Sequence, residues 1–312
     1  MHTPSPPVVC YADAARCIVA DIVSHRLVAE NTYRLRIDCP EIAASALPGQ
    51  FVMLRIPERV DPLLARPLAV YDNFTAADTE PSTGDTPTEA RRRYADFIYT
   101  VQGKFTTALK ELAPGAQLLV WGPLGNGFCV PTVDHLLLVA GGIGQTALLA
   151  LGRECLGNKL YGSPLRSVPR AKRVTFCWGA RHGGLFGDVT DFRDAGMDVR
   201  LATLDGSVGH RGTVVDLLDE LAQTEDLLHP QSIHIACCGP EGMMAAVARW
   251  SAVRKISCDV SLEAPMACGI GICFTCVAKI RDAFGEWDYR RTCIEGPVFN
   301  AMAIDWQAIR TL

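Results

Sequence analysis

The sequence lacks the features that direct a protein to nucleic acid, to a membrane or out of the cell. Its 312 residues carry 30 Lys and Arg against 34 Asp and Glu, so no basic surplus favours nucleic acid or an acidic membrane surface. The longest apolar strand candidate, 136–140, is far shorter than the roughly 20 residues that cross a bilayer. The Pro-rich segment 1–9 has no charged stretch before an apolar one, so we expect no signal peptide. We therefore expect a cytoplasmic globular protein of two or three domains.

Cysteine, in contrast, is abundant, with 13 residues. An odd and scattered set does not resemble a disulfide framework, and in a reducing compartment clustered cysteines more often bind metals. Four of them gather towards the carboxyl end, namely Cys268, Cys273, Cys276 and Cys293. The first three have the spacing C-x4-C-x2-C, with the fourth further on, which is the spacing of plant-type [2Fe–2S] proteins.

Structural zinc is the main alternative for these four cysteines. Zinc sites usually combine two separated C-x2-C pairs, whereas this segment has one such pair and a further cysteine shortly before it. Gly269 and Gly271 would let the loop backbone approach a cluster closely and turn N–H groups towards its sulfurs. The pattern therefore favours a [2Fe–2S] cluster, and the remaining cysteines are mostly small core residues.

Between residues 17 and 130 the chain consists of short β-type runs separated by turns. The expected strands are 34–37, 50–56, 68–71, 97–101 and 117–120. Strands of this length and spacing predict an antiparallel barrel or sandwich. We expect a flexible tail at 1–15, a first domain at 16–130, and within it a mobile insertion at 75–93, which is rich in Thr, Pro, Asp and Glu.

After residue 131 strands and helices alternate. Strands are expected at 136–140, 174–178, 197–202 and 233–237, and helices at 146–154, 214–221 and 242–250. This order predicts a doubly wound parallel sheet in a second domain at 131–256. The Cys- and Gly-rich remainder, 257–312, is expected to form a small third domain around the cysteine cluster. The fold class is therefore multidomain, β plus α/β.

Short motifs in both halves suggest nucleotide cofactors. Arg66-Pro67 opens a barrel strand, where an arginine can neutralise a pyrophosphate. The segment 103–107 opens a helical run at 108–112, and a hydroxyl at a helix N-terminus suits a phosphate. Each of these motifs is weak alone, since both also occur as ordinary turns.

The stronger signal is a set of turns at the ends of successive strands. Gly141, Gly142 and Gly144 lie between a strand and a helix, where their amides can meet a pyrophosphate. Asp205 and the segment 238–240 follow two further strands at the same end of the expected sheet, where ligands of such sheets lie. Together these turns indicate a dinucleotide site.

In the order of these motifs the chain resembles the ferredoxin–NADP reductase superfamily. The carboxyl-terminal position of the cluster makes it similar to the electron-transfer subunits of the class 1B, NAD-linked dihydroorotate dehydrogenases. The resemblance covers about residues 17–300, and its most specific pieces are 66–70, 122–128, 204–212, 238–243, 266–271 and 293–299. It implies an oxidoreductase subunit of pyrimidine biosynthesis that passes electrons from a partner's FMN through a [2Fe–2S] cluster and FAD to NAD⁺.

The resemblance also implies site residues and a partner. FAD would be contacted by Arg66, Pro67, Leu68, Ala69, Ile98, Tyr99, Thr100, Phe105 and Thr106. NAD(H) would be lined by Gly141, Gly142, Gly144, Asp205, Cys238, Gly239 and Pro240, and the cluster would be held by Cys268, Cys273, Cys276 and Cys293. No residue of this chain is expected to oxidise dihydroorotate, so the partner would be an FMN-containing catalytic subunit in a 2+2 heterotetramer. The apolar residues Ile270, Ile272 and Phe274 suit its docking surface.

Two other interpretations of the function stay open. The same motifs would serve a flavin and iron–sulfur reductase of another redox system, such as a ferredoxin, a sulfur or hydrogenase complex, or an oxygenase. The second is a non-catalytic subunit, regulatory or structural, that binds a metal and has lost its flavin, because Ala69 and Phe105 depart from the family's usual Ser and Gly. The choice between NAD and NADP is also open, since Arg181 follows the strand 174–178 and could meet a 2′-phosphate.

Overall fold

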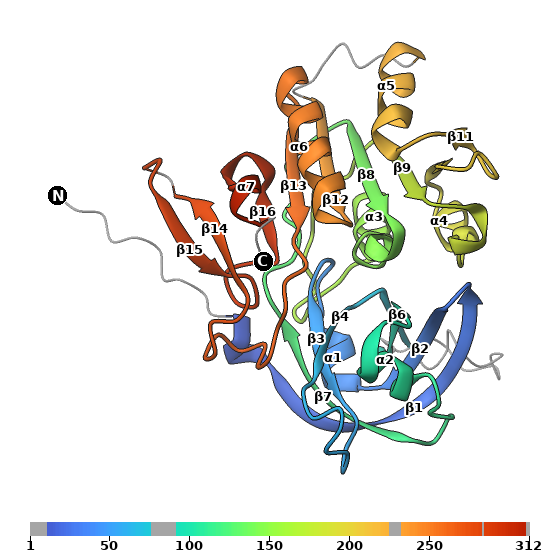
Figure 1. Ribbon diagram of the computed structural model, residues 1–312, viewed down its shortest axis with the longest axis vertical. Helices are drawn as coiled ribbons and strands as arrows, with labels where there is room; N and C mark the ends of the chain where they lie inside the picture. Colours follow the sequence, from blue (N-terminus) through green and yellow to red (C-terminus); the bar gives the residue numbers. More distant parts are fainter. Residues whose placement is uncertain (1–10, 76–91, 225–231, 283, 310–312) are drawn as a thin grey trace.

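The computed structural model of the protein describes residues 11–75, 92–224, 232–282 and 284–309. Two seven-stranded sheets dominate these residues, and a two-stranded hairpin stands beside them (Figure 1). One sheet is antiparallel and the other is almost entirely parallel with helices on both faces, so the expected β plus α/β fold class is confirmed.

The first sheet curls into a half-barrel. Its strands are β1 (Arg16–Ala29), β2 (Thr32–Asp38), β3 (Phe51–Arg55), β4 (Arg66–Ala69), β5 (Asp72–Thr75), β6 (Arg92–Thr100) and β7 (Gln117–Leu124), in the order β4-β3-β7-β1-β2-β6-β5. Helices α1 (Pro40–Ser45) and α2 (Gly103–Leu109) add apolar side chains to its core. Helix α2 begins at Gly103 and ends at Leu109, so the helical run expected at 108–112 starts and stops earlier than predicted.

Two segments of the half-barrel, its beginning and the predicted insertion, differ from what the sequence predicts. Residues 1–10 lie outside the described residues, but a short turn, η1 (Tyr11–Ala14), precedes β1, and Ala12 and Ala15 pack beside β3 and β7. Residues 11–15 are therefore part of the packed structure, and the rest of the tail expected at 1–15 lies outside the described residues. The insertion expected at 75–93 mostly lies outside the described residues, yet Arg93 belongs to β6 and pairs with Asp38.

The second sheet has the order β11-β10-β9-β8-β12-β13-β16 and is parallel except for β16. Its strands are β8 (His135–Gly141), β9 (Arg173–Ala180), β10 (Asp198–Thr203), β11 (His210–Arg211), β12 (Ile233–Cys238), β13 (Ser257–Ser261) and β16 (Val298–Asn300). Strand β8 is apolar and buried along almost its whole length, as a central strand covered on both faces requires.

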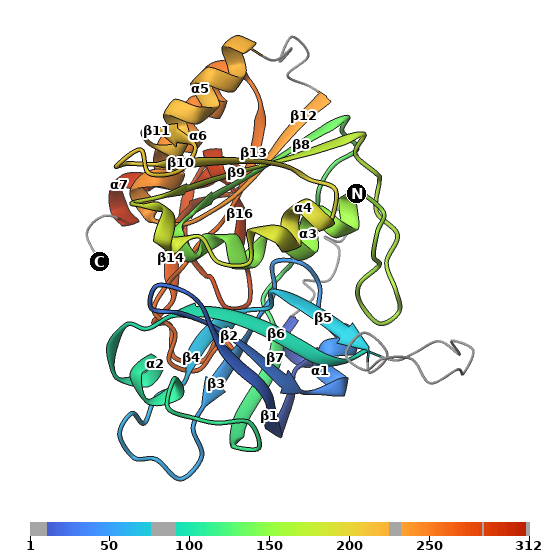
Figure 2. The same ribbon diagram turned by 90° about the vertical axis from the view of Figure 1, so that its right-hand side faces the viewer.

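Helices cover both faces of this sheet (Figure 2). Helices α3 (Leu149–Cys155) and α4 (Val189–Asp194) lie on the face towards the half-barrel, and α5 (Val214–Thr224) and α6 (Glu241–Arg254) lie on the other. The helix expected at 146–154 begins later, because a 3-10 turn, η2 (Gly142–Ala147), comes first. Among the described residues, no helix is long and apolar enough to cross a membrane.

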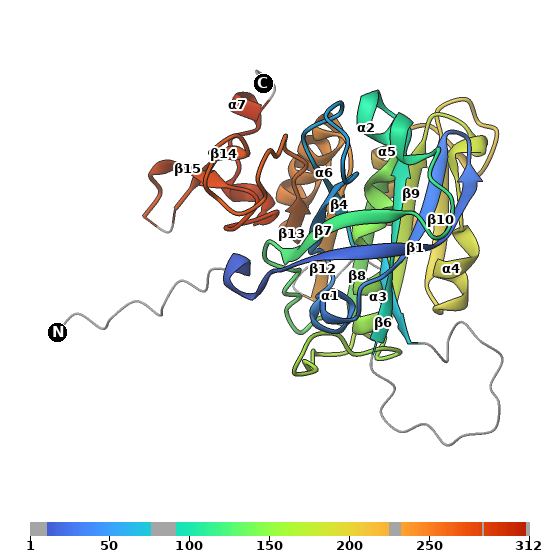
Figure 3. The ribbon, with the colours of Figure 1, turned by 90° about the horizontal axis from the view of Figure 1, so that it is seen from below.

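The parallel sheet extends beyond the boundary expected at residue 256. Strand β13 pairs in parallel with β12, and β16 pairs with β13 in antiparallel fashion, although both fall in the range 257–312. Such pairing between distant segments leaves no local pattern in the sequence. The rest of that range forms the hairpin of β14 (Val277–Arg281) and β15 (Trp287–Arg291), the turn η5 (Ala301–Ala303) and α7 (Trp306–Ile309). Figure 3 shows the hairpin to one side, far from α4.

Buried and partly buried ion pairs join the half-barrel to the second sheet. Arg34 in β2 donates to Asp188 at 2.8 Å and to Asp191 at 2.7 Å, on the α4 side. Asp72 in β5 is 0% exposed and pairs with Arg153 in α3 and with Lys159. Because these contacts span both halves, they fix the relative position of the surfaces between which the candidate site lies.

Candidate cofactor cavity and cysteine loop

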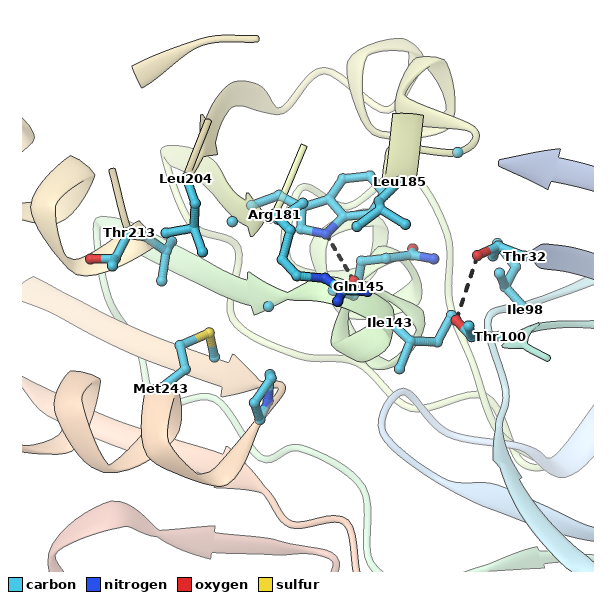
Figure 4. A pocket seen from close by; sticks show the side chains of 18 of the residues that line it. Thr32, Ile98, Thr100, Ile143, Gln145, Arg181, Leu185, Leu204, Thr213 and Met243 are labelled. Carbon is cyan, nitrogen blue, oxygen red and sulfur yellow. Dashed lines mark hydrogen bonds between the residues drawn. The ribbon is translucent and has the colours of Figure 1, made fainter. Parts of the chain in front are cut away.

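A cavity of about 470 Å³ lies where the half-barrel meets the carboxyl ends of the parallel strands (Figure 4). One wall comes from β2, β6 and the turn after β6, through Thr32, Ile98, Thr100 and Gln102. The other walls come from the turns that follow β8, β9, β10 and β12. Ligands of open α/β sheets bind at these strand ends, and the volume lies within the roughly 300–1,000 Å³ of cofactor pockets.

These turns require glycine for two different structural reasons. Gly142 has φ +51°, and a Cβ there would meet no atom within 4 Å, so the cavity has room for a ligand beside this backbone. A Cβ on Gly144 would lie 2.1 Å from the Cys238 carbonyl oxygen, and one on Gly239 would lie 2.8 Å from the Gly141 nitrogen. The last two glycines therefore serve the close packing of the β8 and β12 turns, whereas Gly142 opens towards the cavity.

Side chains alternate between the two faces of β6, so only some of the residues assigned to FAD face the cavity. Ile98 and Thr100 line the cavity, whereas the Tyr99 side chain points into the barrel core and its hydroxyl lies 2.8 Å from His25 Nε2. Phe105 in α2 is also buried in that core. Because the side chains of Tyr99 and Phe105 lie in the barrel core, these two residues could contact FAD only through their backbones.

The remaining residues assigned to FAD lie outside the cavity lining. Arg66, at the start of edge strand β4, is exposed and donates to the Ala65 carbonyl at 3.0 Å. Residues 67–69 continue along β4 and are partly buried against β3. The Thr106 hydroxyl is already used, since it accepts from the Gln102 N–H at 2.6 Å and donates to the Gln102 carbonyl at 2.7 Å. Arg66 is thus free to meet an anion, but Thr106 would have to give up a hydrogen bond.

Likewise, only some of the residues assigned to NAD(H) line the cavity. Pro240 lines the cavity with Gly141 and Gly142. Asp205 lies on the exposed loop after β10, where the hydroxyl and backbone N–H of Ser207 donate to it at 2.7 and 2.9 Å and lower the pKa of its carboxyl. Cys238 ends β12, and burial raises the pKa of its thiol to about 12. It is therefore a neutral thiol at physiological pH.

Two further side chains, those of Gln145 and Trp178, line the cavity although the sequence did not assign them to a ligand, and so does Arg181, which the sequence suggested only for a 2′-phosphate. Gln145, in the turn η2, is 2% exposed. Trp178, near the end of β9, donates from Nε1 to the Gly142 carbonyl at 2.9 Å and so fixes the turn. Arg181 extends into the middle of the cavity (Figure 4). The position of Gln145 directly after the glycine turn was the one signal that could have identified it.

The loop between β13 and β14 carries three of the four clustered cysteines and packs on the half-barrel. Gly269 has φ +73°, and a Cβ there would lie 2.5 Å from Met53 of β3. Gly271 has φ +81°, and a Cβ there would lie 2.6 Å from Ile294. Trp121 of β7 donates from Nε1 to the Cys268 carbonyl at 2.9 Å. These contacts anchor the loop to β3 and β7.

The four cysteines form two pairs. The Thr275 hydroxyl, 3.1 Å from Cys273 Sγ, lowers the pKa of that thiol to about 6, and Cys268 contributes to the same shift. Cys293 hydrogen-bonds Cys276 and lowers the pKa of Cys276 to about 6, while the pKa of Cys293 itself is raised. In the part of the chain that the structure describes, no three His, Cys, Asp or Glu side chains gather around one ion position. A low thiol pKa favours the thiolate, which is the form that binds metals.

A buried hydroxyl lies beside the second pair. Thr292 is 0% exposed, precedes Cys293 and donates its N–H to the Cys276 carbonyl at 2.9 Å. Its hydroxyl is close enough to Cys276 to contribute to the lowered pKa of that thiol, but it makes no hydrogen bond of ordinary geometry with any described residue. A buried hydroxyl without a partner fits a bound group that offers an acceptor, and iron–sulfur clusters do so through their sulfurs.

Comparison with solved structures identifies the class to which this fold and site belong. The chain is similar to a chain of the NADH-dependent reduced ferredoxin-NADP oxidoreductase, with a TM-score of 0.73, 25% identity and coverage of 94% of this chain and 91% of that chain. It also resembles the ferredoxin reductase in carbazole 1,9a-dioxygenase, with a TM-score of 0.59, 19% identity and coverage of 78% and 67%. The fold is thus of the ferredoxin reductase type.

Sequence comparison identifies the family. Residues 263–305 match the family model described as the iron-sulfur cluster binding domain of dihydroorotate dehydrogenase B. The "Dihydroorotate dehydrogenase B (NAD(+)), electron transfer subunit" of Desulforamulus reducens is 32% identical over 92% of this chain and 98% of that protein. The subunit of the same name from Geobacillus sp. is 32% identical over 90% and 95%. The chain belongs to this family of electron transfer subunits, which confirms the resemblance, the oxidoreductase class and the cofactor set of FAD, iron–sulfur cluster and NAD(H).

Proposed function

We propose that this chain moves electrons between a catalytic partner and NAD⁺, as the electron-transfer subunit of an NAD-linked dihydroorotate dehydrogenase in pyrimidine biosynthesis. The observation that carries the proposal is the joint presence of the cavity at the sheet ends and the paired cysteines on the half-barrel. When bound, FAD supplies exchange between one-electron and two-electron transfer, the cluster supplies single-electron transfer, and NAD⁺ accepts a hydride. The reducing cytoplasm remains our prediction for its location.

Four cysteines would hold the cluster in two pairs, Cys268 with Cys273 and Cys276 with Cys293. This pairing follows the contacts between the thiols, and a [2Fe–2S] cluster with four cysteine ligands places two on each iron. The match of residues 263–305 to an iron-sulfur cluster binding domain further supports iron–sulfur over zinc.

The proposed cluster gives the Thr292 hydroxyl a function. A hydrogen bond from this hydroxyl to a cluster or ligand sulfur would stabilise negative charge there, and such bonds tune reduction potential. We expect Thr292→Val to make the midpoint potential of the cluster more negative, as followed by electron paramagnetic resonance during a redox titration. Thr292→Ser keeps the hydroxyl and should remain near the native potential. An unchanged potential in the Val variant would contradict this assignment.

For FAD, the half-barrel supplies the proposed contacts. Arg66 is exposed at the start of β4, where its guanidinium can pair with the pyrophosphate, and the backbone of 67–69 can bond along the ring. Ile98 and Thr100 would face the flavin from β6, with Tyr99 and Phe105 contributing backbone alone. The Thr106 hydroxyl would contact FAD by exchanging one of its hydrogen bonds to Gln102 for one to the cofactor.

On the sheet side, the turns at the strand ends would hold NAD(H). Gly142 offers the open approach to a pyrophosphate, and Pro240 lines the same cavity. The proposed role of Gly141, Gly144, Cys238 and Gly239 is to shape these turns, and that of Asp205 is to reach the nucleotide from the loop after β10.

Cofactor analysis of the anaerobically purified chain tests this function. We expect one FAD and two irons per chain, with both chromophores bleached by NADH. Iron without flavin would contradict the FAD assignment, and zinc without flavin would refute the electron-transfer function.

The partner is proposed to be an FMN-containing catalytic subunit in a 2+2 assembly. Its docking surface would be the apolar tip of the cysteine loop, where Ile270, Ile272 and Phe274 are 39%, 72% and 60% exposed. The second candidate function is electron transfer through the same cofactors to a different partner protein. The likeness to the ferredoxin-NADP oxidoreductase favours it. Association with a dihydroorotate-oxidising flavoprotein separates the two.

Charge placed on this tip should weaken the assembly. We expect Ile272→Glu to raise the dissociation constant for the catalytic subunit by about tenfold or more, because the carboxylate would be desolvated at the interface. Val253→Glu is the matched control, since Val253 is 81% exposed on α6, outside the cysteine loop. Calorimetric titration of the two subunits measures the effect. Equal loss of affinity in both variants would place the interface elsewhere.

A further inference from the structure

The Gln145 carboxamide lies in the cavity wall, and its oxygen lacks a hydrogen bond within the part of the chain that the structure describes. The residue is 2% exposed and lines the cavity, and its Oε1 atom is buried without a hydrogen-bond partner among the described residues. A buried acceptor left without a donor costs free energy, so the position favours a ligand that brings an N–H group.

The surroundings of Gln145 limit what that ligand can be. The nearby indole N–H of Trp178 is already donated to the Gly142 carbonyl. Ile98, Ile143 and Leu185 give the cavity apolar walls. Figure 4 shows Gln145 beside Ile143, with the Arg181 side chain extending towards it. A wall of this composition fits a flat aromatic ring that carries an amide at one edge.

We propose that Gln145 recognises the carboxamide of the nicotinamide ring, with Oε1 accepting a hydrogen bond from the carboxamide N–H. This inference rests on the proposed function. The turn η2 carries both Gln145 and the open Gly142. It belongs to the sheet proposed to hold the nicotinamide nucleotide rather than to the half-barrel proposed to hold the flavin. The bond would fix the orientation of the ring, and thereby the face that it turns towards Ile98 and Thr100.

An analogue without the amide N–H tests the proposal. In acetylpyridine adenine dinucleotide a methyl group replaces the carboxamide nitrogen, so the donor is lost while the carbonyl stays. We expect the native chain, loaded with FAD and cluster, to bind NAD⁺ about threefold to tenfold more tightly than the analogue in calorimetric titrations. Gln145→Leu should bind both with similar affinity. Gln117→Leu, the same change at an exposed position of β7, should keep the native preference.

The outcomes are distinct. Loss of the preference in Gln145→Leu alone supports the contact. A preference that persists in Gln145→Leu overturns it, and the same result with reduced FAD content would instead assign the carboxamide to the flavin. A native chain that holds FAD but binds neither dinucleotide would refute the nicotinamide part of the proposed function. A native chain that binds both equally would refute this inference alone.

Discussion

Chains that carry Cys276→Ser are expected to leave anaerobic purification without iron and with their FAD retained. Cys276 is 1% exposed and packs with Phe51, Met53 and Leu124 of the half-barrel, so no water or neighbouring cysteine can replace its sulfur without rearrangement. A serine hydroxyl is a poor substitute, because clusters of this type are held by thiolates. Iron analysis, flavin analysis and the visible spectrum measure the result.

The matched control for this variant is Cys258→Ser. Cys258 is 2% exposed in β13, within the apolar core formed with α5 and α6 and outside the cysteine loop. The same loss of a buried sulfur should therefore leave the iron content unchanged. Full iron content with an unaltered spectrum in Cys276→Ser would refute the proposed ligand set, whereas iron loss in both variants would indicate a general packing defect.

Asp72→Asn is expected to lower the free energy of unfolding by about 3–5 kcal/mol. The Asp72 carboxylate is 0% exposed and accepts from Lys159 Nζ and Tyr161 Oη, both at 2.8 Å, while it also pairs with Arg153. An amide would leave two cations in partly buried positions without a counter-charge. Urea unfolding of the FAD-loaded chain, followed by tryptophan fluorescence, should show the shift in midpoint.

A surface ion pair provides the comparison for Asp72. Asp38 pairs with Arg93, but the two side chains are 23% and 53% exposed, so water can solvate either charge when the other is lost. We expect Asp38→Asn to change stability by about 1 kcal/mol or less. If the two variants unfold at the same urea concentration, the buried network does not stabilise the joint between the two sheets.

The order of most strands and helices can be predicted from the sequence, because it depends on local patterns. The boundaries between the domains cannot, because they depend on contacts between distant segments. The sequence patterns do not predict strand β1, because only two of its 14 residues are buried and its register against β2 shifts twice. The sequence patterns place strand β13 in the third unit, because its pairing with β12 is a long-range contact that leaves no local signal. In both cases partners distant in the sequence decide the structure.

For the site, the sequence motifs include turns that line the cavity, but they do not determine which side chains face it. The stretch 98–100 was assigned as a block, yet alternation along β6 turns Tyr99 into the barrel core. Thr106 was assigned for its hydroxyl, which α2 already uses at its first turn. Gln145 has only its position after the glycine turn as a signal, since a glutamine there belongs to no motif of its own.

The difference in exposure between the two cysteine pairs has a consequence for oxygen sensitivity. Cys276 and Cys293 lie beneath the half-barrel, whereas Cys273 lies at the surface and Cys268 is partly exposed. With the proposed ligands, dioxygen and chelators would reach the outer iron first, so an isolated subunit would bleach from that side. A partner seated over the loop tip would close this route, and the lifetime of the cluster in air would then report how much of the protein is assembled.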